Sequence, residues 1–244
     1  MFHNMNIVEI FSSIQGEGEF VGYRQVFVRL AGCNLKCDFC DTPSSRTTIA
    51  EGQIEMTPGK RDFKTVTNPV SNVDLINYIN NLLIAPHHSV SFTGGEPLCQ
   101  AAAMAQILPH IKGRIYLETN GTLPKALEPL LPFIDIISMD IKLPEVIHQE
   151  MWQQHSDFLY LAKAHNVFVK LVVTGKTDIM EFKQAIEIIA AIDQKIPLII
   201  QPVTPIHGCE GVMPEMMLFL QEQALAVLAN VRVIPQTHKF MGQL

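Results

Sequence analysis

Short runs rich in Val and Ile alternate along this chain with longer segments in which apolar residues recur at helical spacing. The runs predicted as strands are Gln25–Leu30, Ser89–Thr93, Arg114–Glu118, Ile134–Met139, Val167–Val173, Leu198–Gln201 and Val231–Ile234. The predicted helices are Val73–Ile84, Cys99–Ile111, Leu143–Ala164, Ile179–Ile192 and Pro214–Leu228, with a weaker one near Lys125–Leu130. A β–α alternation repeated this often predicts an α/β fold with a parallel sheet and helical crossovers.

The number of β–α units limits the architecture further. About six units are too few for a closed eightfold barrel, so an incomplete (βα)6-type barrel and an open doubly wound sheet both fit. Two helix starts are marked by capping residues: Ser71 or Asn72 before Val73, and Asp178 before Ile179. In either architecture ligands bind at the carboxyl ends of the strands.

The stretch Ser44–Pro69 interrupts the alternation. It is polar, contains Gly52, Pro58 and Gly59, and directly follows a group of cysteines. We interpret it as an insertion or flap beside the active site, with a surface loop of no special role as the alternative. The whole chain, residues 1–244, is expected to form a single domain that contains this stretch.

Composition excludes several classes of partner. The formal net charge is −6, and no block of Lys and Arg is present, so nucleic acid is not an expected partner. The N-terminus does not resemble a signal peptide, and no apolar run reaches the ~18 residues that a membrane span needs. We therefore expect a cytoplasmic protein without membrane contact, in which the five cysteines do not form a disulfide framework.

Three of those cysteines lie close together in the segment AGCNLKCDFCDTP, at Cys33, Cys37 and Cys40. Three thiolates on one tight loop can bind three irons of a [4Fe–4S] cluster. A structural zinc site would need four ligands, and no nearby Cys or His completes such a set. The fourth iron would then be free to bind the amine and carboxylate of an amino acid, such as the methionine moiety of S-adenosylmethionine (SAM).

This loop resembles the signature of the radical SAM superfamily, including the aromatic Phe39 before the last cysteine. The segment Thr93-Gly94-Gly95-Glu96-Pro97 resembles the superfamily's GGEP motif. Its glycines allow a close backbone approach to a ligand carboxylate, and Glu96 offers a carboxylate to the methionine ammonium. On its own the segment also fits a glycine-rich β–α turn with an acid early in the next helix.

Segments at both ends of the chain narrow the resemblance. They are Glu9-Ile10-Phe11, Ser13–Gly18, Val28–Gly32 before the first cysteine, and the C-terminal Pro235–Leu244. Together they resemble the 7-carboxy-7-deazaguanine synthase family of 7-deazapurine (queuosine-type) biosynthesis. The resemblance implies an incomplete radical SAM barrel and a lyase acting on 6-carboxy-5,6,7,8-tetrahydropterin. It also implies a reaction in which a hydrogen atom leaves C6 of the pterin, the ring contracts with loss of ammonia, and SAM is re-formed.

The resemblance also implies the site residues. The SAM contacts would be Phe39, Cys40, Asp41, Gly95, Glu96, Ser138, Met139, Asp140, Gln201, Pro202, Val203 and Thr204. Polar residues at the ends of parallel strands face the ligand crevice, although they can also simply cap the strand. The chain departs from the family at Ser138-Met139-Asp140-Ile141-Lys142, where Ser-Pro-Lys is common.

The implied substrate contacts are Ile14, Gln15, Gly16, Arg29, Thr93 and Leu244. Arg29 would hold the substrate carboxylate in a bidentate fork, with an ion pair on the strand as its alternative role. The family also binds Mg²⁺ through the threonine of Cys-Asp-Thr, which here is Thr42.

Two other functions fit parts of this pattern. A glycyl-radical activating enzyme has the same cysteine spacing and Gly-Gly-Glu turn, but acts on a protein. A non-catalytic iron–sulfur module for electron transfer would use four protein ligands. The small-molecule enzyme is favoured because the loop Ile14–Gly18 and the tail Gln236–Lys239 match its family.

The remaining predictions concern partners and single residues. The resemblance implies reduced flavodoxin or a similar electron donor, and a homodimer. The methionines Met213, Met216 and Met217 fit either an interface or the core. His207, Cys209 and Glu210 form a weak candidate metal site, and Cys99 is expected to be a small buried residue.

Overall fold

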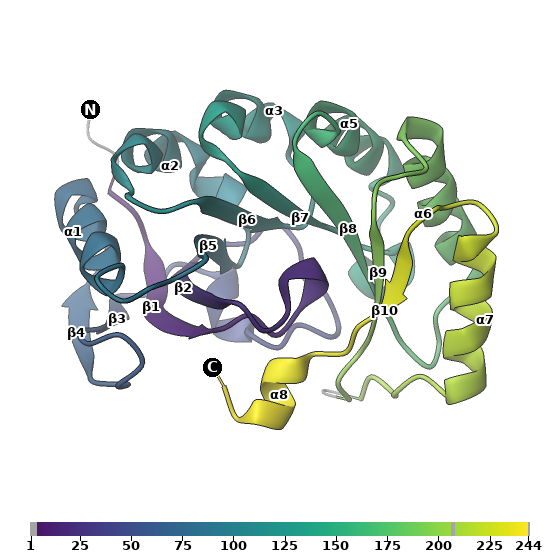
Figure 1. Ribbon diagram of the computed structural model, residues 1–244, viewed down its shortest axis with the longest axis horizontal. Coiled ribbons are helices and arrows are strands. Elements are labelled where there is room, and N and C mark those ends of the chain that lie inside the picture. The colour runs from purple at the N-terminus through teal and green to yellow at the C-terminus, as the bar shows by residue number, and fades with distance from the viewer. Residues whose placement is uncertain (1–3, 206–207, 244) are drawn as a thin grey trace.

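The computed structural model describes residues 4–205 and 208–243, which form one mixed sheet with helices on one side (Figure 1). The sheet has ten strands in the order β10-β9-β8-β7-β6-β5-β2-β1-β3-β4. The strands are β1 (Ile7–Ile14), β2 (Arg24–Leu30), β3 (Glu51–Glu55), β4 (Phe63–Thr67), β5 (Ser89–Gly94), β6 (Ile115–Thr119), β7 (Ile136–Ile141), β8 (Asn166–Val173), β9 (Leu198–Pro202) and β10 (Val231–Val233).

The run from β2 through β5 to β10 is parallel at every step. Its two ends do not pair with each other within the described residues, so the barrel is incomplete, as predicted. The register places Arg29 of β2 beside Thr93 of β5, and Glu118 of β6 beside Ser138 of β7. Side chains of neighbouring strands therefore meet at the same edge.

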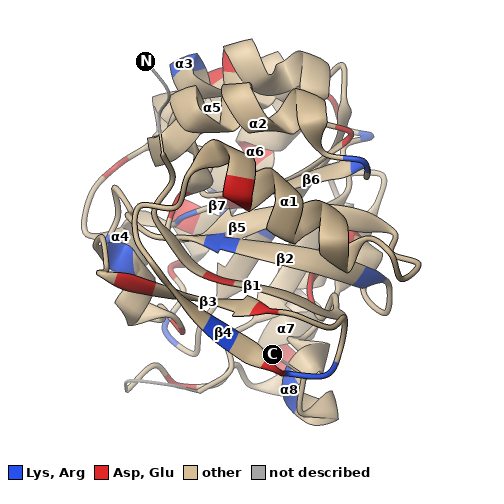
Figure 2. Cartoon of the chain, turned by 90° about the vertical axis from the view of Figure 1, so that its left-hand side faces the viewer, with Lys and Arg blue, Asp and Glu red and all other residues tan. Residues whose placement is uncertain are grey.

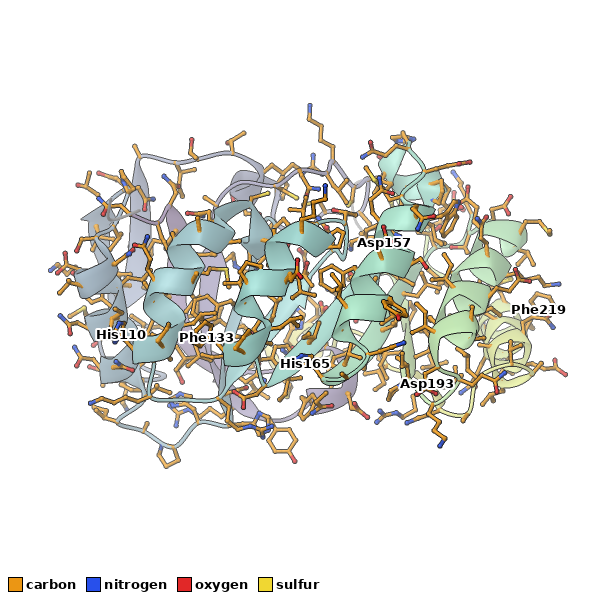
Figure 3. All side chains as sticks on the ribbon, turned by 90° about the horizontal axis from the view of Figure 1, so that it is seen from above. His110, Phe133, Asp157, His165, Asp193 and Phe219 are labelled. Atoms are coloured by element: carbon orange, nitrogen blue, oxygen red, sulfur yellow. The ribbon has the colours of Figure 1, made fainter. Side chains whose placement is uncertain are left out.

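Helices cover the outer side of this parallel run, where they lie next to one another (Figure 3). The α-helices are α1 (Asn72–Leu82), α2 (Ala101–Ile107), α3 (Pro124–Leu127), α4 (Pro144–Ile147), α5 (Trp152–Ala162), α6 (Ile179–Ile192), α7 (Pro214–Leu225) and α8 (Thr237–Met241). The last, α8, lies apart from this layer in the C-terminal segment and has no buried residue (Figure 1). The buried faces of the others pack on Val, Ile and Leu of the strands in one continuous core. None of the helices in the described part of the chain is long and apolar enough to cross a bilayer.

Both capping predictions are confirmed. Ser71 caps α1 by accepting a hydrogen bond from the Asp74 amide at 3.1 Å. The Asp178 carboxylate caps α6 by accepting from the amides of Met180 (2.7 Å) and Glu181 (3.1 Å). These side chains satisfy amide groups that the helix itself leaves unpaired.

The predicted single helix Leu143–Ala164 is wrong. It is divided into α4 and α5, because His148 adopts a left-handed conformation with φ of 57° and ends α4. The His148 amide donates to the Pro144 carbonyl at 2.7 Å, which closes the short helix. Helical apolar spacing continues across the break, so periodicity alone does not reveal it.

The stretch Ser44–Pro69 is an ordered part of the sheet rather than a loop. β3 pairs in parallel with β1, and β4 pairs antiparallel with β3 to form the sheet edge (Figure 2). The usual alternation is hidden because two of the buried positions of β3 are Gly52 and Glu55. A Cβ on Gly52 would lie 2.9 Å from the Ile7 carbonyl oxygen, so only glycine fits there.

Candidate active site

A cavity of about 310 Å³ opens at the carboxyl ends of the parallel strands, where the sequence predicts ligand binding. The predicted site residues that line it are Ile14, Gln15, Gly16, Arg29, Cys33, Cys37, Phe39, Cys40, Asp41, Thr42, Thr93, Gly95, Ser138, Asp140, Gln201, Val203 and Thr204. Glu96, Met139 and Pro202 do not line it, and Leu244 lies outside the described residues. The fold therefore brings most of the predicted set into one space.

The cysteine loop lies at one wall of this cavity, with all three thiols partly buried. Backbone hydrogen bonds fix the loop: the Gly32 amide donates to Ser45 O at 2.7 Å, and the Cys33 amide donates to Arg46 O at 3.1 Å. Burial raises the pKa of the Cys33 and Cys37 thiols, so their thiolates need a compensating cation. Iron provides one, and a [4Fe–4S] cluster fits this donor set.

The glycines of the Thr93–Pro97 segment serve backbone packing as well as lining the cavity. The Gly95 amide donates to Leu30 O at 3.0 Å, and the Glu96 amide donates to Gly32 O at 2.8 Å. A Cβ on Gly95 would lie 2.2 Å from the Gly32 carbonyl oxygen. The segment is thus bonded directly to the base of the cysteine loop.

The predicted role of Glu96 as a ligand of the methionine ammonium is not supported by its position. Its side chain is fully buried, and its carboxylate accepts from the Leu98 amide (3.0 Å), the Thr119 hydroxyl (2.8 Å) and the Asn120 amide (2.7 Å). Burial raises the pKa of Glu96 to about 7, although these hydrogen bonds oppose the shift. Glu96 ties the β5 and β6 strand ends together instead.

Two predicted SAM contacts carry buried oxygens that lack a partner among the described residues. They are Oδ1 of Asp140 and Oε1 of Gln201. Both residues line the cavity and are less than a tenth exposed. An unpaired buried acceptor is costly, so each oxygen is suited to a donor on a bound ligand. This fits the binding of SAM.

Met139 does not line the cavity, so its predicted contact with SAM stays a prediction. Side chains alternate along a strand, so Ser138 and Asp140 face the cavity while Met139 enters the helix-side core. Pro202, the last residue of β9, is likewise not part of the lining.

Glu118 of β6 is a site residue that the sequence reasoning missed. Its Oε1 accepts from Gln15 Nε2 at 2.7 Å and from the Ser91 hydroxyl at 3.1 Å. Its Oε2 accepts from the Thr93 hydroxyl at 2.8 Å. The position of Glu118 near the carboxyl end of a parallel strand was the signal that would have found it. It joins two predicted substrate contacts, Gln15 and Thr93.

Arg29 forms the ion pair that was considered as its alternative role. Its Nε donates to Glu9 Oε1 at 2.8 Å, between two directly opposite residues of β1 and β2. Among the described residues no hydrogen bond uses its two terminal amines, and the side chain lines the cavity. Glu9 therefore holds Arg29 in place while leaving donors for an anionic ligand.

The C-terminal segment closes the cavity against the loop after β1. The Gly16 carbonyl accepts from the Thr237 amide at 2.8 Å, and a Cβ on Gly16 would lie 2.3 Å from His238 Nδ1. Gln236 Nε2 donates to Glu17 Oε1 at 2.6 Å and to Asp41 Oδ2 at 3.3 Å. The loop after β1 and the C-terminal segment, both of which carry motifs of the resemblance, thus meet at the site.

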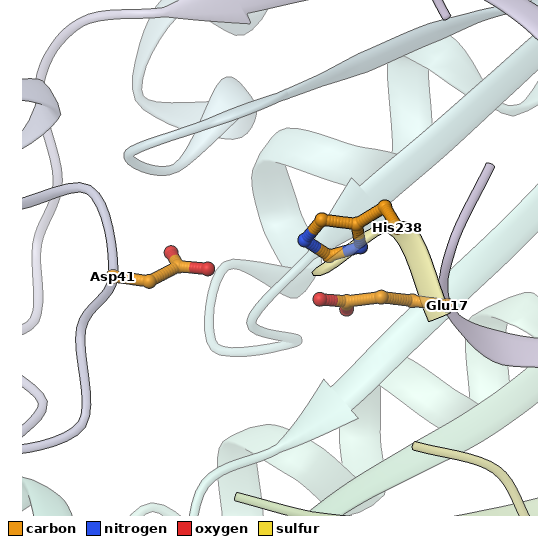
Figure 4. A group of neighbouring side chains, drawn as sticks. All are labelled: Glu17, Asp41 and His238. Atoms are coloured by element: carbon orange, nitrogen blue, oxygen red, sulfur yellow. The ribbon is translucent and has the colours of Figure 1, made fainter. Parts of the chain in front are cut away.

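Glu17, Asp41 and His238 have potential metal-ligating atoms within 4.8 Å of one another (Figure 4). Two lysines already balance this group: Lys170 pairs with Glu17, and Lys239 Nζ lies 3.6 Å from Asp41 Oδ2. Burial is the largest single influence on the pKa of Glu17 and raises it, but the Lys170 charge and the hydrogen bonds from Lys170 and Gln236 together lower that pKa to about 2. We therefore interpret the group as part of the closure, meaning the contact between the loop after β1 and the C-terminal segment, rather than as a metal site.

Thr42 also lies at the cavity, half-buried, and its hydroxyl donates to Asp41 Oδ1 at 3.1 Å. The hydroxyl oxygen keeps lone pairs for a cation, so the residue is compatible with the predicted Mg²⁺ site.

Two minor predictions concern cysteines. Cys99 is exposed rather than buried, because it lies in a 3-10 turn (Pro97–Gln100) before α2. Of the weak candidate metal site, His207 lies outside the described residues, while Glu210 Oε1 lies 3.9 Å from Lys176 Nζ.

Comparison with known proteins agrees with this site. The model of the radical SAM superfamily matches residues 28–175. The 7-carboxy-7-deazaguanine synthase of Geobacter sulfurreducens is 46% identical over 97% of this chain and 96% of its own length. The enzyme of that name from Methanothermobacter thermautotrophicus is 34% identical over 97% of this chain and 96% of its own length.

Solved structures show the same fold at lower identity. The crystal structure of QueE from Escherichia coli has a TM-score of 0.62 and 20% identity over 96% of this chain and 95% of that chain. A radical SAM methyltransferase from Sphaerobacter thermophilus has a TM-score of 0.59 and 12% identity over 88% of this chain and 70% of that chain. The chain is therefore a radical SAM enzyme, and it belongs to the 7-carboxy-7-deazaguanine synthase family.

Proposed function

We propose that this enzyme converts 6-carboxy-5,6,7,8-tetrahydropterin to 7-carboxy-7-deazaguanine with loss of ammonia. The observation that carries the proposal is the position of Glu118, Gln15 and Thr93 in the same cavity as the three cysteines. A 2-amino-4-oxopyrimidine ring presents adjacent N–H donors and a carbonyl acceptor. A carboxylate beside an amide side chain complements that edge.

The other end of the substrate carries the carboxylate. Arg29 is the cation that lines the cavity on β2, four residues before Cys33. Its terminal amines can bind a carboxylate in a fork while Nε stays on Glu9. This arrangement orients the pterin with its carboxylated carbon toward the cysteine loop.

SAM is proposed to bind between the cysteine loop and the ends of β7 and β9. Bound there, the reduced cluster and SAM supply the radical that removes a hydrogen atom from the substrate. Asp140 Oδ1 and Gln201 Oε1 accept hydrogen bonds from SAM, since each lacks a partner in the part of the chain that the structure describes. Phe39, Ser138, Val203 and Thr204 complete this wall. The closure between Gly16 and Thr237 keeps water away from the radical.

Mg²⁺ is proposed to bind at Thr42. A hard cation with few protein ligands suits a threonine hydroxyl together with the substrate carboxylate, and the adjacent Asp41 adds negative charge. The ion would neutralise the substrate carboxylate jointly with Arg29.

The finer predictions about partners and location remain part of this proposal. A homodimer would cover apolar side chains on and just before α7 that are exposed in the single chain, including Met213, Leu218 and Leu225. Reduced flavodoxin, or a similar one-electron donor, would supply the electron. The cytoplasm is the proposed compartment, because three free thiols on one loop require reducing conditions to bind iron.

The proposal is tested by incubating the reconstituted enzyme with SAM, dithionite, Mg²⁺ and 6-carboxy-5,6,7,8-tetrahydropterin, and measuring the deazapurine by mass spectrometry. We expect product from the native enzyme. Glu118→Gln should lose about 100-fold in kcat/KM, because a buried charge-assisted contact is worth about 2–3 kcal/mol. Glu187→Gln, an exposed change on α6, is the matched control and should behave as native.

Two outcomes would contradict the proposal. The first is the absence of product from an enzyme that holds its cluster and cleaves SAM, which would favour a protein substrate and hence a glycyl-radical activating enzyme. The second is an unchanged kcat/KM for Glu118→Gln, which would remove the residue from substrate recognition.

A further inference from the structure

A buried lysine lies against the cysteine loop at the wall of the cavity, and has no role in the chemistry described so far. Lys142 directly follows β7, and its side chain is 13% exposed. Its Nζ lies 2.7 Å from Asp140 Oδ2 and 4.9 Å from the centroid of the Phe39 ring. Phe39 lies between the cluster ligands Cys37 and Cys40, so the ammonium packs against the middle of the loop.

Lys142 ends a row of buried charges of alternating sign. Glu17 pairs with Lys170, whose Nζ lies 3.3 Å from Asp140 Oδ2, and Asp140 pairs with Lys142. The row has no net charge, but it has a direction. Its negative end is at the closure, and its positive end is at the cysteine loop.

The ammonium of Lys142 contacts the cysteine loop directly, through the ring of Phe39. The Asp140 carboxylate is shared between two ammonium groups, those of Lys142 and Lys170. Its single negative charge therefore does not cancel the positive field of Lys142 at the loop. The low dielectric of a buried site preserves that field.

We propose that Lys142 is a positioning residue whose buried charge raises the reduction potential of the [4Fe–4S] cluster. One-electron reduction adds one negative charge to the cluster, and the electron comes from an external one-electron donor. A nearby fixed cation stabilises the reduced form more than the oxidised form, and net charge is a known determinant of cluster potential. The proposal concerns the cluster alone and does not depend on which substrate the enzyme uses.

A purely structural ion pair would behave differently. Loss of such a pair would lower stability and iron content. It would not shift the reduction potential in opposite directions in the two variants. The field argument predicts opposite shifts when the two members of the pair are neutralised in turn. The sign of the shift separates the two explanations.

The test measures the midpoint potential of the reconstituted full-length enzyme without SAM, by a dithionite titration followed by EPR. Lys142→Gln should lower the reduction equilibrium constant by at least tenfold, which is about 59 mV for one electron. Lys142→Arg should stay near the native value, and Asp140→Asn should shift the potential upward.

Lys163 provides the matched control, because its Nζ lies over the Tyr160 ring at 3.7 Å in the same kind of contact, but on the exposed end of α5. Lys163→Gln should leave the potential unchanged.

The proposal is overturned if Lys142→Gln binds its cluster with a native potential, or if Lys163→Gln shifts the potential equally. If Lys142→Gln fails to bind iron, the potentials of Lys142→Arg and Asp140→Asn decide between the two explanations. A potential that falls in Asp140→Asn, or a reduction equilibrium constant that changes tenfold in Lys142→Arg, would overturn the proposal. Because SAM and pterin are absent from this titration, its failure is distinguishable from a failure of the proposed reaction.

Discussion

The two sides of the cavity are built differently. On the cofactor side, the cysteine loop and the ends of β5 to β9 are fixed by the sheet and by buried hydrogen bonds such as those of Glu96. On the closing side, the loop Ile14–Glu17 meets the C-terminal segment through a few contacts between residues more than 200 positions apart, such as Gln236 with Glu17. We infer that the cofactor side determines whether the enzyme works, and that the closing side adjusts how tightly it holds its substrate.

The largest effect is expected on the cofactor side. Cys37→Ala should abolish cluster binding and all product formation, because the two remaining thiolates are too few to bind the [4Fe–4S] cluster. Iron content and the visible absorption of the reconstituted protein measure this. Cys99→Ala is the matched control and should keep both native, since Cys99 is exposed and lies outside the cavity lining. Equal loss in both variants would contradict the assigned ligand set.

The buried pair of Lys170 and Glu17 joins the two sides and should matter most for stability. Lys170→Met should lower the free energy of unfolding by about 3 kcal/mol, because it leaves Glu17 buried without its cation. Lys195→Met, an exposed change, should cost almost nothing. Urea denaturation of both variants measures the difference, and equal midpoints would show that the pair does not stabilise the fold.

The same pair predicts a pH dependence. The pKa of Glu17 falls from 4.5 to about 2 on folding, so its stabilising effect is complete above pH 4.5 and is lost as the pH falls toward 2. In the native protein, protonation of Glu17 should lower the free energy of unfolding by about 3 kcal/mol over that pH range. Lys170→Met should show a shallower loss across the same window. Parallel stability curves for the two proteins would refute the assignment.

A smaller effect is expected at the closure. Gln236→Ala removes the hydrogen bonds to Glu17 and Asp41, and should lower kcat/KM by roughly tenfold, or about 1.4 kcal/mol. Steady-state kinetics with the pterin would show the change mainly in KM. Gln194→Ala on the far surface serves as the control. A loss of activity in Gln236→Ala as complete as that in Cys37→Ala would contradict the proposed difference between the cofactor side and the closing side.

The smallest effect is expected at the hairpin of β3 and β4. Arg61 Nη2 donates to the Gly242 carbonyl at 2.9 Å, and thereby connects the hairpin to the C-terminal segment. Because this bond is exposed, Arg61→Ala should raise KM by roughly threefold, with kcat unchanged. Lys60→Ala, at the neighbouring exposed position, should leave KM unchanged. A change confined to kcat would argue against a role in closure.

The sequence predicted the cofactor side better than the closing side, for physical reasons. Buried parallel strands are continuous Val and Ile runs, and three cysteines on one loop have few chemical interpretations, so both were recognisable. The hairpin was missed because Gly52 and Glu55 occupy buried positions of β3, where apolar residues are expected. Glu55 is tolerated there since its carboxylate accepts from the Ser12 amide (2.8 Å) and the Arg61 amide (2.7 Å).

Roles of individual polar residues depended on partners that lie far away in sequence. Glu96 fits a superfamily motif, yet its oxygens are taken by Thr119 and Asn120 on the next strand. Glu118 belongs to no motif that was singled out, and Lys142 was noted only as the end of a segment that departs from the family. Their roles became visible only when the strand ends were brought together. Pairing across strands is not encoded in local spacing, which is why these assignments required the structure.

The central claim is that both sides of the cavity act on one carbon of one substrate. The most direct test uses 6-carboxy-5,6,7,8-tetrahydropterin labelled with deuterium at C6, incubated with the reduced enzyme and SAM, followed by mass spectrometry of recovered SAM. We expect deuterium to appear in SAM as 7-carboxy-7-deazaguanine forms. Product formation with no deuterium in SAM, or deoxyadenosine release with no label and no product, would contradict the account.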